Sequence, residues 1–173
     1  MKPQPQKYPV SMIVFHTLIA AFMIAALVLA WCLDDNKGLV GLHKSLGVTV
    51  LLLAVLRLLN RFRFKNAIPE SVNPKGSLQR TLEKSVHGML YLTMFGLPFV
   101  GWMMSNAFGY PASFFGLFNL PTLIEKNEAL GETLLEMHEL GANVFIGLLV
   151  LHLAGGILHF IKHKQNVFKR MMP

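Results

Sequence analysis

Long stretches without a charged residue alternate with short charged segments along this chain of 173 residues. Residues 10–33 hold 24 positions without a charge, residues 85–124 hold 40, and residues 140–161 hold 22. A fourth run, residues 45–56, holds 12 and needs its flanking residues to reach the length of a span. A helix needs about 20 apolar residues to cross a membrane. The pattern therefore predicts four membrane-spanning helices, at about residues 10–33, 42–60, 85–106 and 137–161.

The third charge-free run is far longer than one span requires. Its second half contains several glycines and prolines, among them Gly109 and Pro111, interleaved with phenylalanines. Turn residues of this kind interrupt helices, and aromatic side chains favour the boundary between membrane and water. We predict that residues 107–124 form a loop or a short helix on the outer interface and cap the bundle. Within the span itself, Pro98 and Gly101 should bend or loosen the helix.

The composition is typical of a membrane protein with a single domain. Hydrophobic residues make up 53% of the chain and charged residues only 14%, against about 25% in soluble domains. The first apolar run is too long for the core of a signal peptide, and no Ala-x-Ala cleavage site follows it. We therefore interpret it as a retained span.

The positively charged residues gather before the first span, between the second and third, and after the fourth. The positive-inside rule then predicts that both termini lie in the cytoplasm. This topology accounts for the net charge of +7, and no basic-aromatic motif indicates nucleic-acid binding. The two outer loops carry Lys37, Lys44 and Lys126, against Asp34, Asp35, Glu125, Glu128, Glu132, Glu136 and Glu139.

Six of the seven histidines lie in or beside the spans. An ionisable side chain inside a span indicates a functional site, because a buried imidazole without a partner is costly. For a single histidine, the alternative is a hydrogen bond to a neighbouring helix. His163 falls in the basic tail and is expected to be a surface residue. The depth of a histidine in the membrane can be compared with that of others, although depth alone does not exclude His159 as a partner of His16. Measured from the flanking charges, the six form three pairs of similar depth, His16 with His152, His43 with His138, and His87 with His159.

Paired imidazoles at two depths favour haem over other metal groups. A haem iron takes two axial ligands on opposite faces, and histidine is a common one. Zinc sites need four clustered ligands, and di-iron sites need carboxylates on facing helices, whereas the charge-free runs contain none. The single cysteine and the absence of a Cys-x-x-Cys-His motif indicate haem without thioether bonds, which is b-type.

Short motifs in a fixed order connect these histidines with a known family. Each motif is weak alone, but their order makes the set specific. They are His16 in the first span, Gly-Leu-His43-Lys-Ser-Leu-Gly and Val-Leu-Arg57-Leu-Leu-Asn-Arg61 in the second, His87-Gly-Met-Leu-Tyr with Pro98 and Gly101 in the third, and Glu-Met-His138-Glu-Leu-Gly-Ala-Asn, Leu-His152-Leu-Ala and a Phe-Lys-Arg-Met-Met-Pro end. Over nearly its whole length the chain resembles the bacterial cytochrome b561 family, small four-span proteins related to the cytochrome b subunits of nickel-iron hydrogenases.

The resemblance implies an all-α integral membrane four-helix bundle that binds two b-type haems in its core. It implies that His16 and His152 bind one haem iron towards the cytoplasm, and that His43 and His138 bind the other towards the periplasm. It also implies a location in the lipid of the bacterial inner membrane, as a multi-pass protein with both termini in the cytoplasm. The oligomeric state stays open, with a homo-oligomer among the alternatives.

Members of that family exchange electrons with quinone, and one is understood to oxidise superoxide and reduce ubiquinone. We therefore expect electron transfer across the membrane between a periplasmic donor or acceptor and the quinone pool of the respiratory chain. The chain would be either a quinone-reducing oxidoreductase of the superoxide-oxidase kind or a pure electron-transfer protein. Its acidic outer surface does not favour attraction of superoxide, so a positively charged carrier or redox protein is another candidate donor. The alternative function is that of the membrane-anchor cytochrome b subunit of a larger oxidoreductase.

The remaining polar residues receive roles as hypotheses. Lys44, Arg57 and Arg61 would neutralise haem propionates, although the two arginines could equally belong to a basic anchor at the membrane surface. His87 and His159 would flank the head group of ubiquinone or another quinone and supply its proton. Hydrogen bonding to lipid or to the backbone is the alternative for these two histidines.

Overall fold

The computed structural model describes residues 7–33, 36–163 and 166–171, without the side chains of residues 162 and 163. Four long helices dominate the described residues, and each is long and apolar enough to cross a membrane. A short antiparallel hairpin and three turns of 3₁₀-helix accompany them. In chain order the elements are α1 (Val10–Trp31), η1 (Lys37–Leu39), α2 (Val40–Arg63), η2 (Lys65–Ala67), α3 (Leu78–Ala107), β1 (Ser113–Phe114), β2 (Phe118–Asn119), α4 (Glu128–His163) and η3 (Val167–Arg170).

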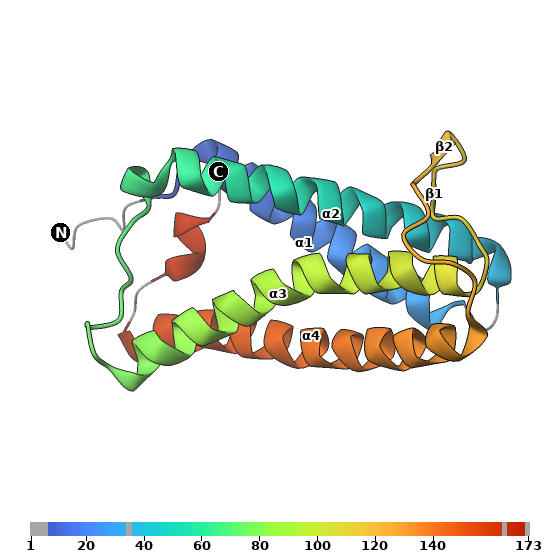
Figure 1. Cartoon of the computed structure of the whole chain (residues 1–173). Helices are drawn as coiled ribbons and strands as arrows, with labels where there is room; N and C mark the ends of the chain where they lie inside the picture. Colours follow the sequence, from blue (N-terminus) through green and yellow to red (C-terminus); the bar gives the residue numbers. More distant parts are fainter. Residues whose placement is uncertain (1–6, 34–35, 164–165, 172–173) are drawn as a thin grey trace.

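The four helices run up and down as one bundle (Figure 1). The main helix contacts join α1 to α2, α2 to α3, and α3 to α4. The start of α1 and element η3 lie towards one end of the bundle, which we call the terminal end, and the hairpin lies at the other, the hairpin end (Figure 1). The prediction of an all-α membrane bundle with four spanning helices is thus confirmed.

Three of the four helices extend beyond the predicted spans, most of all at the starts of α3 and α4, whereas α1 ends at Trp31, within its predicted span. Helix α3 starts after Ser77, whose hydroxyl accepts a hydrogen bond from the backbone N–H of Arg80 at 3.2 Å. The acidic segment before residue 137 is already helical, because Asn127 accepts from the N–H of Leu130 at 3.0 Å. Both are ordinary N-caps, which stabilise a helix start in water. Helix α3 continues through Pro98 as one helix and changes direction along its length (Figure 1).

The segment predicted as a loop or short helix contains the hairpin, in which Phe114 pairs with Phe118. Its turn places Phe115 and Gly116 at positive φ, 48° and 71°. Glycine adopts this conformation freely, but an aromatic residue seldom does. The N–H of Phe115 donates to the hydroxyl of Ser45, at 2.8 Å, and Ser45 is buried on α2. The hairpin is therefore fixed to α2 through this strained position.

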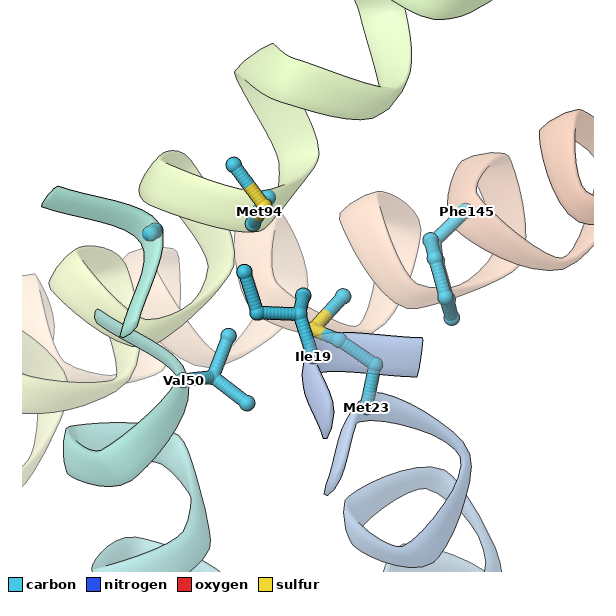
Figure 2. Close-up of a cluster of buried hydrophobic side chains, with 6 residues drawn as sticks. Ile19, Met23, Val50, Met94 and Phe145 are labelled. Atoms are coloured by element: carbon cyan, nitrogen blue, oxygen red, sulfur yellow. The ribbon is translucent and has the colours of Figure 1, made fainter. Parts of the chain in front are cut away.

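A cluster of apolar side chains fills the middle of the bundle, with contributions from all four helices (Figure 2). Val50 and Ala54 on α2 have no exposed surface at all. Much of the bundle's outside is apolar as well, as expected when lipid replaces water around the helices. The cluster consists of Ile19 and Met23 from α1, Val50 and Ala54 from α2, Met94 from α3 and Phe145 from α4.

The C-terminal segment folds back over the terminal end of the bundle. The carbonyl of Arg170 accepts a hydrogen bond from the N–H of Tyr8 at 3.1 Å, and the Arg170 guanidinium donates to the Glu70 carbonyl at 2.7 Å. The ring of Phe168 lies so close to Gly156 that a Cβ there would come within 2.7 Å of it. Element η3 therefore forms part of the bundle's end.

We expect the hairpin tip to lie in the membrane–water interface, because Leu117 is 77% exposed in a segment without charged residues. The test is a spin label at Leu117→Cys in a Cys32→Ser background, reconstituted in lipid vesicles. The label should collide readily with oxygen and poorly with a water-soluble nickel chelate. A label at the exposed position Glu132→Cys is the control, and equal nickel accessibility at both positions would contradict the interfacial placement.

Candidate functional site

Four of the predicted site histidines form two pairs in the structure. His16 on α1 faces His152 on α4, with ring centroids 6.1 Å apart and planes at 84°. His43 on α2 faces His138 on α4, again at 6.1 Å, with planes at 78°. The first pair lies towards the terminal end and the second towards the hairpin end. Helix α4 thus supplies one ring to each pair, and 14 residues, about 21 Å of helix rise, separate its two histidines.

The spacing within each pair fits a metal ion bound between the two rings. An imidazole nitrogen binds a metal at about 2.0–2.1 Å and lies about 1.1 Å from its ring centre, so two opposed ligands hold their centroids about 6.2–6.4 Å apart. The centroid distance of 6.1 Å in both pairs lies within about 0.3 Å of this range. In the described part of the chain, no three His, Cys, Asp or Glu side chains cluster as a metal site would require. Two opposed rings without further ligands fit a planar group that supplies the remaining ligands, as haem does.

The backbone around the hairpin-end pair is arranged to orient both rings. The Nδ1 of His43 lies 2.9 Å from the carbonyl of Ala26 on α1. The Nδ1 of His138 is buried and has no hydrogen-bond partner among the described residues. A Cβ on Gly101 would lie 3.1 Å from the Cε1 of His138, so this glycine leaves the room that the ring occupies. Such contacts around ligating histidines fix the ring and its tautomer.

A cavity of about 590 Å³ opens beside the terminal-end pair. Its volume is within the usual range for sites that bind organic cofactors or ligands. The walls are mostly apolar and come from all four helices together with η3. Its polar lining includes five predicted site residues, His16, Arg57, His87, His152 and His159, and three that were not predicted, Glu83, Tyr91 and Arg170.

His87 lies against the terminal-end pair rather than apart from it. Its ring centroid is 5.1 Å from that of His152, too short for both rings to bind one iron from opposite faces. Its Nδ1 lies 2.7 Å from the Glu83 carbonyl, which can only accept. A neutral His87 therefore keeps Nε2 unprotonated. The carboxylate of Glu83 acts electrostatically on both His87 and His159.

The three predicted cationic residues have different surroundings. Arg57 donates from Nη1 to the Nδ1 of His16 at 3.0 Å, and from Nε to the hydroxyl of Tyr91 at 3.2 Å. Arg61 lies over the same Tyr91 ring, 5.9 Å from its centroid, and does not line the cavity. Lys44 donates to the Ser105 hydroxyl at 2.7 Å, close to the hairpin. Of the three, only Arg57 contacts a predicted ligand.

Sequence reasoning missed several residues that line or support the cavity. Glu83 precedes His87 by one helical turn, a signal that could have placed both on one face. Its carboxylate accepts from Ser71 and from Asn73, the latter at 3.0 Å, and so anchors the loop before α3. Nothing in the periodicity could have brought Arg170 to the cavity, because the return of η3 depends on long-range contacts.

Comparison with known proteins agrees with the resemblance found in the motifs. A model of the family described as prokaryotic cytochrome b561 matches residues 7–173. Cytochrome b561 homolog 1 of Escherichia coli (strain K12) is 30% identical over 131 residues, covering 76% of this chain and 73% of that protein. Homolog 2 of the same organism is 26% identical over 175 residues, 97% of this chain and 92% of that protein. A protein named probable superoxide oxidase CybB, from Yersinia pestis, is 28% identical over 177 residues, 97% of each chain.

The close approach of Gly101 to His138 predicts that Gly101→Ala disturbs the hairpin-end pair. The added methyl group must push the ring by a few tenths of an ångström. Residues that orient metal ligands change affinity by about tenfold or more when replaced, so we expect haem binding at this pair to weaken on that scale. Haem content and the reduced-minus-oxidised spectrum of the purified protein measure the effect. Gly96→Ala, on the same helix with open space around its Cβ, is the control, and equal spectra of the two variants would exclude the role of Gly101.

Proposed function

The chain belongs to the prokaryotic cytochrome b561 family, and we propose that it relays single electrons through two haem b groups, from a partner at the hairpin end to a quinone at the terminal end. Membership makes it a multi-pass membrane protein of the b-type cytochrome class with a role in electron transfer. The observation that carries the proposal is the pair of equivalent histidine sites, each with ring centroids 6.1 Å apart, at two depths of one bundle.

We assign His16 and His152 to one haem and His43 and His138 to the other. Haem iron, when bound, supplies a one-electron couple, and the chain supplies ligands, burial and access. The apolar cluster that includes Met23, Met94 and Phe145 (Figure 2) borders the terminal-end cavity, and Phe145 lies midway between His138 and His152 along α4. Electrons would pass from one haem to the other across this part of the bundle.

We propose that the haem between His16 and His152 takes up most of the terminal-end cavity, since both rings line it, and that the quinone head group lies at the margin of this haem, beside His87 and His159. His87 exchanges its proton at Nε2, because Nδ1 is engaged by the Glu83 carbonyl. The Glu83 carboxylate lies one helical turn before His87 on α3 and lines the same cavity as both histidines. Ubiquinone and related quinones have a flat polar head and an apolar tail, which suits a mostly apolar cavity with a few polar groups.

The positive-inside rule supports an orientation with both termini in the cytoplasm of a bacterial inner membrane. The hairpin end, with its electron donor, then faces the periplasm. Lys126 is paired with Glu128 at 3.0 Å and Lys44 is directed to Ser105, whereas Glu132, Glu136 and Glu139 are exposed. This surface favours a positively charged carrier or redox protein. The name of the Yersinia relative makes superoxide the second candidate, although an anion gains nothing from an acidic surface.

Lys44, Arg57 and Arg61 stay proposed partners of the haem propionates. Each would offer a permanent or nearly permanent positive charge to a carboxylate at the edge of the haem. Arg57 also contacts the ring of His16, a proposed haem ligand.

Replacing one ligand of each pair should remove one haem at a time. We expect two haem b per chain in the unaltered protein and about one in His16→Ala and in His138→Ala, because an axial ligand holds the iron directly. Haem extraction with protein quantitation gives the ratio. His163→Ala, outside both pairs, should keep both haems, and unchanged content in either ligand variant would refute the assignment.

The role of His87 has a separate test. His87→Ala should slow the reduction of haem by quinol at least tenfold, because a positioned acid–base group contributes about 10²–10⁴-fold to proton transfer. Stopped-flow absorbance with a soluble quinol measures this rate, and dithionite reduction should proceed as in the unaltered protein. Loss of a haem from the variant would instead identify His87 as a ligand.

A further inference from the structure

The two histidine pairs differ in what their Nδ1 atoms face. The Nδ1 of His43 faces the Ala26 carbonyl, which can only accept, so this nitrogen carries a proton and donates. The Nδ1 of His16 faces a nitrogen of the Arg57 guanidinium, which can only donate, so this nitrogen accepts. One ring is thus supported by a backbone acceptor, and the other by a cation.

Arg57 is held in this position from a second side. Its Nε donates to the Tyr91 hydroxyl at 3.2 Å, and its guanidinium lies over the Tyr91 ring, 5.4 Å from the centroid. An arginine side chain keeps its charge under all ordinary conditions. Arg57 contacts a ring of the terminal-end pair directly, whereas Lys44, the cation next to His43 in the sequence, donates to Ser105 instead.

We propose that Arg57 makes the terminal-end haem site the more easily reduced of the two, and so directs electrons from the hairpin end to the terminal end. The inference rests on the proposed function, because it takes the two histidine pairs as haem ligands. Reduction lowers the charge of an iron site by one, and a fixed positive charge nearby favours the reduced form. At the other site, the carbonyl on His43 raises the basicity of the ring and favours the oxidised form. The two effects act in the same direction.

Removal of Arg57 would change the redox potential of the terminal-end site in the opposite direction if Arg57 served to keep the Nδ1 of His16 without a proton. A neutral His16 that bound iron through Nε2 would carry its proton on Nδ1, so Arg57 would turn its donor aside and act on the site through its charge alone. If Nδ1 instead kept accepting from Arg57, a ring bound through Nε2 would have lost both protons. A deprotonated ring would favour the oxidised form, so removal of Arg57 would then make the site easier to reduce. The sign of the change in potential therefore decides between the two roles.

Redox titration of Arg57→Gln, followed by absorbance on purified protein, tests the proposal. The titration is made in the His138→Ala background, where only the terminal-end haem is expected. We expect the ferrous-to-ferric ratio at a given potential to fall about tenfold against His138→Ala alone, which for one electron is about 59 mV. The same substitution in the His16→Ala background should leave the hairpin-end haem unchanged. A rise or no shift at the terminal-end haem would overturn the proposal.

Two further variants serve as controls for the redox titration. Arg63→Gln removes an equal charge near the end of α2, where Arg63 lies over the ring of Phe64, and should cause no shift. Tyr91→Phe keeps the aromatic ring but removes the hydroxyl that holds Arg57, and should lower the ratio by a smaller factor, about threefold. If Arg57→Gln does not fold, an unchanged potential in Tyr91→Phe would overturn the proposal.

Failure of the proposed function is distinguishable from failure of this inference. If His16→Ala and His138→Ala do not each lose one haem, the ligand assignment is wrong whatever the potentials are. If both lose one haem as expected and Arg57→Gln leaves the terminal-end potential unchanged, only the role of Arg57 is refuted.

Discussion

The burial of imidazoles among apolar helices is the constraint on which the rest of this structure depends. A polar ring inside a span must find a partner, because neither lipid nor water is there to satisfy it. Helix α4 provides a partner ring for two other histidines, since it carries His138 and His152 on nearly one face. Helices α1 and α2 each bring one histidine to that face, at opposite ends of the bundle. The spacing of His138 and His152 along α4 thus sets the depths of both sites.

Small residues and separation of helices then make room for what the rings bind. At the hairpin end, Gly101 lets α3 approach the ring of His138, and Gly141 leaves no space for a Cβ beside Leu97. At the terminal end the helices stand around a cavity instead, and η3 closes part of it through Phe168 against Gly156. On the proposed function, the cavity at the terminal end is the opening through which a membrane-soluble partner would reach the relay.

The sequence alone predicted the spans and two of the three histidine pairs, His16 with His152 and His43 with His138, because both depend on local patterns. The ring next to His87 is that of His152, and the predicted pair of His87 with His159 stays a prediction. Charge-free runs mark the apolar depth of a helix, and flanking charges measure where His16 and His152 lie within it. Helix ends were placed less well, since caps such as Ser77 and Asn127 extend helices into water. Long-range contacts escaped prediction altogether, as the Arg57 bond to His16 depends on side-chain reach and on how α1 and α2 pack.

The same arginines connect membrane topology with the chemistry of the site. Arg57, Arg61 and Arg63 end α2 as a basic segment, which on the orientation proposed above would lie at the cytoplasmic side. Arg57 lies deepest of the three, one helical turn inside Arg61, and is the one that contacts a histidine ring. On the proposed assignment, a charge placed for insertion also biases the nearby iron site towards its reduced form. Orientation in the membrane and direction of electron flow would then have one physical origin.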